Sequence, residues 1–296
     1  MESVLSIENL SKSYRAVQAV KNLNLEILPG QAYGILGPNG SGKTTTLSII
    51  CGILRQDSGS FKWFGEEPNP SRRKQIGSLI ETPNFYPYLN LERNLKIICD
   101  IKEIDYSGID SVLETADLLQ RKKSKFSTLS MGMKQRLGIA AALLGDPKVL
   151  VLDEPTNSLD PEGIAEVREV VIRQVEAGKT LILASHILSE VEKICSHVAI
   201  LRNGKLLASG SVKELLAEET VVEVACHDND LLKNKLTQSG IVKEVNEENH
   251  HLVVILLPGK EPEDLNRFAF HENLVLTHLV NRKKSLEAQF LELVKQ

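Results

Sequence analysis

A glycine-rich stretch between two apolar segments most constrains the fold of this chain. It reads Gly37-Pro-Asn-Gly40-Ser-Gly42-Lys43-Thr44 and fits the pattern G-x-x-x-x-G-K-[ST] in full. Ile35-Leu36 before it predicts a short strand, and the apolar spacing from Thr44 to Ile53 predicts a helix. Strand, loop and helix in this order are typical of a phosphate-binding loop (P-loop), whose backbone N–H groups close around phosphate oxygens.

A glycine-rich turn could also match this pattern by chance. At average residue frequencies such a match arises in roughly one chain in a hundred of this length. The strand and the helix around the loop favour nucleotide binding, with Lys43 bridging the β- and γ-phosphates of ATP and the Thr44 hydroxyl binding Mg²⁺. The candidate nucleotide-binding residues of the loop are Gly37, Pro38, Asn39, Gly40, Ser41, Gly42, Lys43, Thr44 and Thr45.

Two adjacent carboxylates follow a second apolar run. Val149–Leu152 predicts a buried strand, which Asp153 and Glu154 end and Pro155 breaks. Asp153 is placed to hold Mg²⁺, and Glu154 to act as the general base for a water that attacks the γ-phosphate. The alternative is a solvated turn or a helix N-cap. The apolar run and the proline favour the catalytic interpretation.

Composition excludes some classes of protein. A chain of 296 residues suits one large and one smaller domain, and a net charge of -4 argues against nucleic-acid binding driven by bulk positive charge. The four cysteines form no Cys-x-x-Cys pair, so we expect free thiols in a reducing compartment. No apolar run reaches the roughly 18 residues of a membrane span. Since the N-terminal segment also lacks a basic region, we expect a cytoplasmic protein that meets a membrane only through a partner.

The pattern along residues 1–218 predicts an α/β domain. Strand-like runs alternate with helical segments, which indicates a parallel sheet covered on both faces. The strand-like runs are 4–10, 23–28, 148–152, 180–184 and 197–201. Residues 83–145, with apolar spacing at 89–98, 106–119 and 133–144, predict a helical subdomain. Asn203-Gly204 predicts a tight hairpin turn before a charged helix over 211–218.

Residues 219–296 predict a separate small α+β domain. Strand patterns cover 220–226, 241–245, 251–257 and 274–280, and helix patterns cover 230–238, 261–270 and 286–294. The order βαββαβα fits a split-βαβ, ferredoxin-like fold with one added helix. The predicted hairpin turns at Glu247-Glu248-Asn249.

A third motif, Leu129-Ser130-Met131-Gly132-Met133-Lys134-Gln135-Arg136, lies just before the Val149–Leu152 strand. From the residues alone, Ser130 could simply N-cap the helix that follows. A helix N-terminus also binds anions, so a phosphate-binding role is compatible with the cap.

These three motifs, in this order, resemble those of the ABC transporter ATPases throughout residues 1 to about 218. In that family two nucleotide-binding domains clasp two ATP molecules, each held between the P-loop of one subunit and the signature motif of the other. The resemblance implies that Ser130 and Gly132 contact the γ-phosphate of an ATP held by a partner subunit. It also implies a P-loop NTPase fold of the ABC type.

The resemblance assigns three more residues. It identifies Tyr14 as the aromatic that stacks on adenine, Asp160 as part of the D-loop Ser158-Leu159-Asp160, and His186 as the switch histidine near the γ-phosphate. Each has an ordinary alternative: a surface tyrosine, an N-cap for the helix at Pro161, and a structural histidine. Tyr14 falls between the first two predicted strands, and His186 lies 33 residues after Asp153 (186 minus 153), which favours the functional roles.

Three positions depart from the family pattern. Met131 replaces the first signature glycine and Met133 the usual glutamine, which removes a polar contact near the ribose. Glu81 replaces a glutamine that offers its side chain to Mg²⁺ and the attacking water. An inactive pseudo-ATPase is the alternative, and the presence of Lys43 and Glu154 argues against it. The segments 80–89 and 129–136 are similar to those of the bacitracin-resistance and lantibiotic self-protection exporters.

We therefore expect an ATP-hydrolysing subunit of a bacterial ABC exporter, with ATP and Mg²⁺ as cofactors. The resemblance implies a homodimer or a paired ATPase subunit, and separate integral-membrane permeases that dock near 81–89 on the inner face of the membrane. The alternatives are a permease-free ABC ATPase acting on ribosomes or DNA, a regulatory subunit that binds ATP without hydrolysis, and a P-loop kinase or GTPase. The absence of tandem ATPase domains and the acidic charge argue against the first, and the signature motif against the last.

Overall fold

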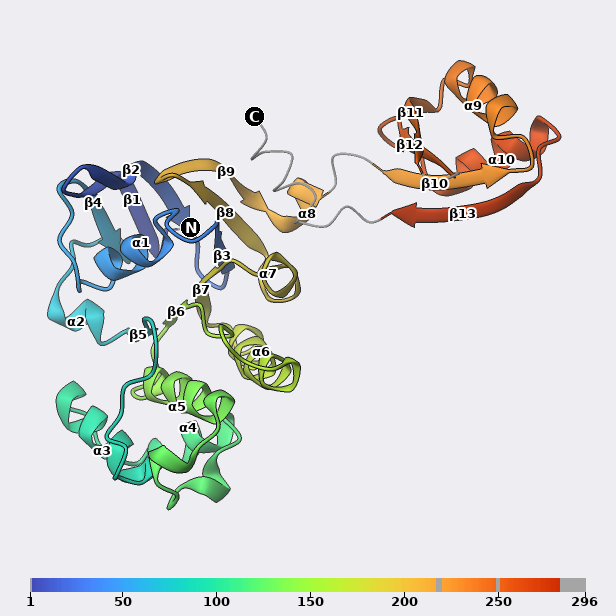
Figure 1. Ribbon diagram of the computed structural model, residues 1–296. Coiled ribbons are helices and arrows are strands. Elements are labelled where there is room, and N and C mark those ends of the chain that lie inside the picture. Colours follow the sequence, from blue (N-terminus) through green and yellow to red (C-terminus); the bar gives the residue numbers. More distant parts are fainter. Residues whose placement is uncertain (1, 217–219, 249–250, 283–296) are drawn as a thin grey trace. The chain divides into compact units, whose positions relative to one another are not determined.

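A six-stranded sheet forms the centre of the first of two compact units, residues 1–211 and 212–296 (Figure 1). The computed structural model describes residues 2–216, 220–248 and 251–282. The sheet has the order β5 (Ile76–Leu79), β6 (Val149–Asp153), β7 (Thr180–Ser185), β3 (Ala32–Leu36), β8 (His197–Arg202) and β9 (Lys205–Ser211). The first five strands are parallel, and β9 returns antiparallel. Every residue of β3, β6 and β7 is buried, as their continuous apolar sequences require in a sheet covered on both faces.

The pairing register brings three carboxyl strand ends together. Leu36 pairs with Ser185, and Asp153 pairs with Ala184. The P-loop leaves the end of β3, Glu154 follows β6, and His186 follows β7. The strand order, in which β3 lies beside β7 and β8, therefore places residues from distant parts of the sequence at one edge of the sheet.

A second, three-stranded antiparallel sheet covers the helix that follows the P-loop. It has the order β2 (Val17–Ile27), β1 (Leu5–Tyr14) and β4 (Ser58–Trp63). Apolar residues of this sheet, of α1 (Lys43–Ile50) and of the large sheet share one core. Trp63 closes it by donating its Nε1–H to the carbonyl of Ile50 at 2.9 Å. The strand patterns did not predict β4, and they ended β1 too early: Tyr14 is the last residue of β1, not a residue between two strands.

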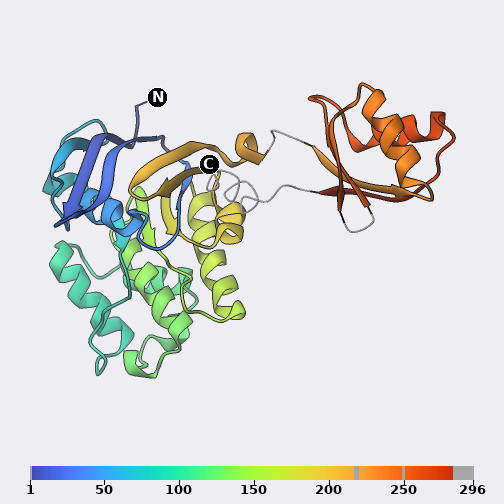
Figure 2. The same cartoon turned by 45° about the horizontal axis from the view of Figure 1, so that its top comes forward.

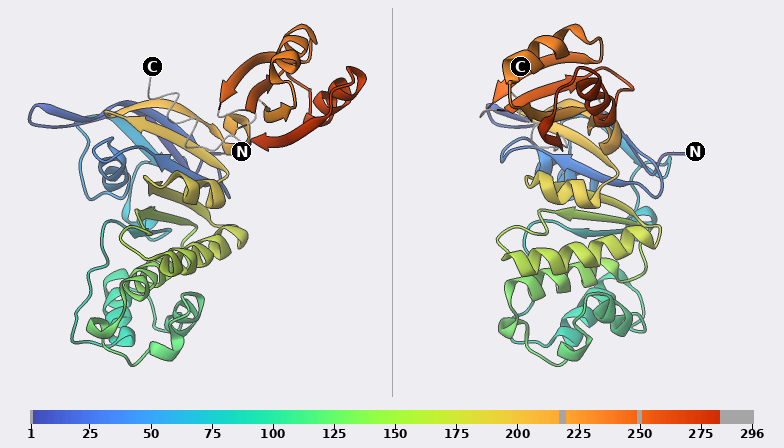
Figure 3. Two further views of the ribbon diagram at one scale, coloured as in Figure 1. Left: turned by 45° about the vertical axis from the view of Figure 1, so that its right-hand side comes forward. Right: turned by 90° about the vertical axis from the view of Figure 1, so that its right-hand side faces the viewer.

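Helices surround the large sheet. They are α2 (Pro70–Arg73), α3 (Leu91–Lys102), α4 (Ile109–Thr115), α5 (Met131–Leu143), α6 (Pro161–Glu176) and α7 (Leu188–Ile194), with 3-10 turns at Leu119–Arg121 and Phe126–Thr128. The helices α5 and α6 run side by side in both views of Figure 3. The single helix expected over 106–119 is wrong. The chain turns at Asp117, whose φ of 55° leaves the right-handed helical region, so α4 ends at Thr115.

The second unit begins with α8 (Val212–Leu216). It continues with β10 (Val221–Cys226), α9 (Asn229–Gln238), β11 (Val242–Glu248), β12 (His251–Leu256), α10 (Pro262–His271) and β13 (Leu276–Arg282). Its sheet has the order β11-β12-β10-β13 with antiparallel neighbours, which confirms the split-βαβ prediction. Leu232 and Leu265 from the two helices pack against Val222 and Val254 on one face of the sheet (Figure 2). The expected helix over 286–294 and Asn249 of the expected hairpin turn lie outside the described residues.

Two further predictions concern the hairpin turn at Asn203-Gly204 and the four cysteines. Asn203 and Gly204, with φ of 50° and 79°, join β8 to β9, which confirms the hairpin turn. All four cysteines are free, and burial raises the pKa of the Cys51 thiol to about 12. In the part of the chain that the structure describes, no helix is both long enough and apolar enough to cross a bilayer.

Candidate active site

The P-loop builds a cradle of backbone N–H groups at the start of α1. Gly40 has a φ of 80°, which side chains other than glycine's rarely allow. Gly42 lies so close to β2 that a Cβ atom would stand 2.4 Å from the carbonyl oxygen of Ala19. Gly42 caps α1 without any side-chain hydrogen bond, so no side chain competes for the first N–H groups of the helix. This arrangement is suited to an anion such as a phosphate.

Glu154 joins the P-loop lysine to the histidine. Lys43 is 5% exposed, and its Nζ donates to the carbonyl of Gly37 at 2.8 Å and lies 3.3 Å from Oε1 of Glu154. The other oxygen, Oε2 of Glu154, lies 2.8 Å from Nδ1 of His186 and accepts from its backbone N–H at 3.3 Å. The structure thus brings together three residues that stand at 43, 154 and 186 in the sequence. A carboxylate held between a cation and an imidazole can accept a proton once the cation binds a phosphate instead.

Asp153 is a buried carboxylate with an unsatisfied oxygen. It is 2% exposed, and Oδ1 has no hydrogen-bond partner among the described residues. Burial raises its pKa, a hydrogen bond from the Thr44 side chain lowers it, and the negative charges of Glu154 and Glu81 raise it further. A carboxylate and a hydroxyl oxygen are ligands that Mg²⁺ accepts. The described residues contain no cluster of three or more His, Cys, Asp or Glu able to hold a metal, which is compatible with Mg²⁺, because it keeps water and phosphate ligands.

Two acidic residues of the site have unusual backbone geometry. Glu81, the second residue after β5, has a φ of 61°, and Glu154 has a φ of 47°. Non-glycine residues adopt this left-handed region infrequently, and such strain concentrates at functional sites. Glu81 is exposed, and its charge acts on Asp153 across the site.

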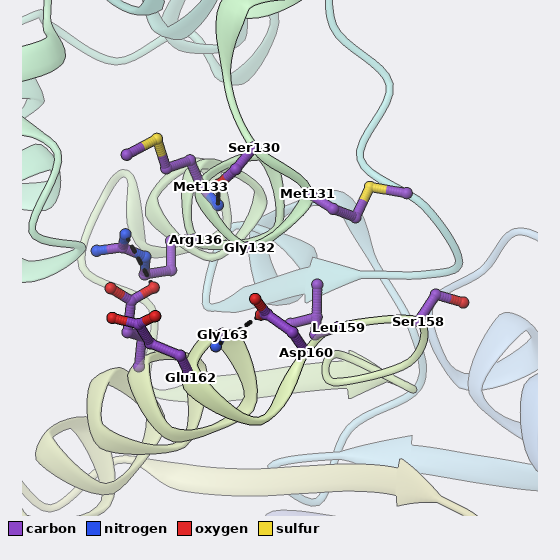
Figure 4. A pocket seen from close by; sticks show the side chains of 11 residues that line it. Ser130, Met131, Gly132, Met133, Arg136, Ser158, Leu159, Asp160, Glu162 and Gly163 are labelled. Atoms are coloured by element: carbon purple, nitrogen blue, oxygen red, sulfur yellow. Dashed lines mark hydrogen bonds and ion pairs between the residues drawn. The ribbon is translucent and has the colours of Figure 1, made fainter.

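The signature motif and the D-loop line a separate cavity of about 510 Å³. Figure 4 shows Ser130 and Gly132 at the start of α5 facing Leu159 and Asp160 at the start of α6. Both N-cap alternatives are realised: Ser130 accepts from the N–H of Met133 at 3.2 Å, and Asp160 accepts from the N–H of Gly163 at 3.0 Å. The cavity lining includes no residue of the P-loop and neither Asp153 nor Glu154. Within one chain, the signature motif and the P-loop therefore line no common cavity here.

Sequence reasoning missed Arg136, which also lines this cavity. The residue is buried, and its side chain forms an ion pair with Glu166 of α6 at 3.2 Å. The available signal was an arginine directly before an apolar run, at Arg136-Leu-Gly-Ile-Ala-Ala. Tyr14 lies apart from this cavity, 45% exposed at the end of β1, with Nζ of Lys12 5.9 Å from the ring centre. A ring exposed to this extent can still stack on a base.

Comparison with known proteins relates this geometry to a family. Residues 20–157 match the family model described as ABC transporter. The chain is 36% identical to the uncharacterized ABC transporter ATP-binding protein YdbJ of Bacillus subtilis, over 98% of this chain and 95% of that protein. It is 33% identical to the bacitracin transport ATP-binding protein BcrA of Enterococcus faecalis, over 99% and 97%. It is 38% identical to the lantibiotic transport ATP-binding protein SrtF of Streptococcus pyogenes, over 74% and 99%.

Solved structures agree with this assignment. The subunit cbiO1 of Clostridium perfringens, part of the ABC transporter complex cbiONQ, aligns with a TM-score of 0.67 at 28% identity, over 74% of this chain and 92% of that one. A dimeric post-hydrolysis state of the ATP-binding cassette MJ0796, bound to ADP and Pi, aligns with a TM-score of 0.62 at 25% identity, over 70% and 98%. YdbJ and BcrA match across nearly the whole chain. The chain therefore belongs to the ABC transporter ATP-binding proteins and is an ATPase subunit of that family.

Proposed function

We propose that this ATPase powers the export of peptide antibiotics through separate integral-membrane subunits. The relatives named for bacitracin and lantibiotic transport support this substrate class. The observation that carries the catalytic part of the proposal is the contact of Glu154 with both Lys43 and His186 at the carboxyl ends of the strands. A carboxylate in this position is suited to accept a proton from water, a step that hydrolysis requires and binding alone does not.

Glu154 acts as the general base and His186 orients it. When ATP enters the cradle, the phosphates take the place of Glu154 as the partner of Lys43, because they carry more negative charge. Glu154 then accepts a proton from water while the water oxygen bonds to the γ-phosphorus and the bond to the β–γ bridging oxygen breaks. The products are ADP and phosphate. The Nδ1 contact of His186 at 2.8 Å keeps the carboxylate aimed at the end of the triphosphate.

Thr44 and Asp153 would hold Mg²⁺ beside the phosphates, and Glu81 adds a third oxygen ligand or a water contact. The unsatisfied Oδ1 of Asp153 and its hydrogen bond with Thr44 support this assignment. The cation supplies positive charge that offsets the negative charge developing on the transferred group. Because Glu81 is a carboxylate where relatives of the wider family have an amide, we expect nucleotide binding to depend strongly on the metal.

Two copies of the chain, or one copy and a paired subunit, complete each site. The separation of the signature cavity from the P-loop supports this assembly, since Ser130, Gly132 and Asp160 line a cavity to which no residue of the P-loop contributes. The permease docks on a second groove of about 410 Å³, lined by Phe85, Tyr86 and Ile101 among others. Tyr86, which lines this groove, is half exposed, and Tyr88, two residues further along the chain, is 66% exposed. The chain then lies on the inner face of the membrane through this contact.

The test combines purification with a resistance assay. The tagged protein is purified from gently solubilised membranes of its host, where we expect one or two polytopic membrane subunits to accompany it. A host lacking the chain should become more sensitive to bacitracin or to a lantibiotic, and the wild-type chain should restore resistance while Glu154→Gln should not. Unchanged sensitivity to both classes, together with purification of the chain alone or with ribosomes, would contradict the proposal.

A further inference from the structure

Two arginines from neighbouring helices hold the same helix end. Arg136 of α5 donates its Nη1 hydrogen bonds to the carbonyl oxygens of Ala116 at 3.0 Å and Asp117 at 3.4 Å. Arg173 of α6 donates from Nη2 to the carbonyl of Thr115 at 3.1 Å and to Oδ2 of Asp117 at 2.7 Å. These carbonyls end α4, where no further turn of helix supplies N–H donors. The end of α4 therefore connects α5 to α6.

An ion pair also joins α5 to α6 directly. Nη2 of Arg136 lies 3.2 Å from Oε2 of Glu166, and Figure 4 shows Arg136 opposite the acidic face of α6. The Arg136 side chain is 6% exposed and that of Glu166 is 44% exposed, so the guanidinium charge is nearly desolvated. Glu166 and Arg173 stand seven residues apart, close to two helical turns, and their side chains leave the same face of α6. One face of α6 is thus tied to α5 near its start and to α4 further along.

The positions of these contacts matter because of where the two helices begin. Helix α5 starts directly after Ser130, and α6 starts directly after Asp160. The Arg136–Glu166 pair lies six residues beyond each cap (136 minus 130 and 166 minus 160). It therefore joins the two helices at the same distance from their N-termini. The starts also pack closely, because a Cβ atom at Gly132 would stand 3.5 Å from Cα of Gly163.

We propose that Glu166, Arg136 and Arg173 are positioning residues, which make the signature motif and the D-loop approach the partner's nucleotide as one rigid body. The inference rests on the proposed function, in which Ser130 and Asp160 face an ATP held by a second subunit. Without the Arg136–Glu166 pair the starts of α5 and α6 shift independently. Fewer molecules then hold the signature motif and the D-loop together in the arrangement that contacts the partner's nucleotide. Association driven by ATP then weakens. Nucleotide binding to the P-loop of the single chain, which shares none of these residues, stays unchanged.

The test measures dimer formation in the Glu154→Gln background, where turnover does not remove ATP. Sedimentation velocity gives the ATP concentration at which half of the protein is dimeric. Glu166→Gln should raise this concentration about ten-fold, because a hydrogen bond to a charged group commonly contributes about one power of ten to an equilibrium. Glu169→Gln is the matched control: it makes the same chemical change on the exposed side of the same helix and should change nothing.

Two further variants separate positioning from general stability. Asp117→Asn removes the charge that faces Arg173 and should give a smaller shift, about three-fold. Glu166→Asp keeps the charge opposite Arg136 and should recover part of the lost association. For every variant the Kd of ADP, measured by calorimetry on the monomer, should equal that of the parent.

Three results would overturn the inference. Glu166→Gln and Glu169→Gln could dimerise at the same ATP concentration, which would show that the ion pair positions nothing. Glu166→Gln could weaken ADP binding as much as it weakens dimerisation, which would show a structural role alone. The Glu154→Gln parent could stay monomeric at saturating ATP and Mg²⁺. This result would contradict the proposed ATP-driven dimer itself, and it would be seen before any variant of Glu166 or Asp117 is made.

Discussion

The site at the strand ends and the signature cavity differ in how their polar groups are satisfied. At the strand ends, Lys43, Glu154 and His186 contact one another across the sheet edge. In the signature cavity, the side chains of Ser130 and Asp160 accept hydrogen bonds from the first turns of their own helices and face about 510 Å³ of open space. The first region holds the phosphate-binding lysine and the proposed general base in contact with each other. The second forms one side of a site. This supports a model in which residues of one chain carry out the chemistry and two chains together close the site.

The largest effect should come from Glu154→Gln. Loss of the base should reduce the rate of ATP hydrolysis about 10³-fold, since general-base catalysis contributes about 10²- to 10⁴-fold. The same change should tighten ADP binding, because Glu154 no longer competes for Lys43 at 3.3 Å. Phosphate release measures the first effect and calorimetry the second, with Glu169→Gln as the control. Hydrolysis at the wild-type rate would place the base elsewhere.

Mixing two inactive variants should restore part of the activity. Lys43→Ala disables the strand-end site, and Gly132→Leu fills the signature cavity where the Cβ has only Gly163 Cα and Glu166 within 4 Å. In a mixed dimer, one composite site combines the intact P-loop of the second variant with the intact signature of the first. Random pairing gives half mixed dimers with one working site of two, or about a quarter of wild-type activity. A mixture no more active than its components would contradict this model, in which the strand-end site of one chain and the signature cavity of another form one working site.

Tyr14 should affect nucleotide affinity moderately and leave the rest of the cycle intact. Stacking of a base on an aromatic ring contributes about 1–3 kcal/mol, so Tyr14→Ala should raise the Kd of ADP about ten-fold or more. Tyr14→Phe keeps the ring and should bind as the parent does. The tyrosine is half exposed at the end of β1, so the protein should fold normally in both cases. Equal affinity for ADP in the parent and in both variants would show that Tyr14 is an ordinary surface residue.

The smallest effect concerns the stability of the nucleotide-free protein. Burial raises the pKa of Asp153 above the ordinary 3.8, so the ionised form is disfavoured in the folded state. The penalty is present in full at neutral pH, is relieved as pH falls through the raised pKa, and is absent below 3.8. Asp153→Asn should therefore raise Tm by a few degrees at pH 7 and by progressively less toward acid pH. Calorimetric scans without Mg²⁺ measure this, and equal Tm values at pH 7 would contradict the burial argument.

Much of the strand-end site was predictable because its signals are local. A glycine loop between a strand and a helix, and carboxylates directly after a buried strand, depend on residues that are neighbours in sequence. In the structure β6 pairs with β7 and β7 pairs with β3, so the carboxyl ends of these strands lie side by side. The sequence patterns missed β4 and the full length of β1, because short polar edge strands such as Ser58–Trp63 are stabilised by pairing with a distant partner and not by their own composition.

The arrangement of the signature cavity was much less predictable from the sequence. Ser130 and Asp160 were recognisable as helix caps, yet nothing in the order of residues placed them on the same cavity. Arg136 and Arg173 meet the end of α4, and Arg136 meets Glu166, through the packing of three helices. These sequence separations are ones that no periodicity reports.

By itself, the sequence determined the family, the phosphate-binding loop and the identity of the groups available for chemistry, since each rests on short-range backbone geometry and residue type. Only the tertiary structure decided which of those groups touch. Contacts such as Glu154 with His186, or Arg136 with Glu166, depend on strand order and helix packing. These arise from burying apolar faces across the whole unit, and the polar side chains are carried to their partners by that packing.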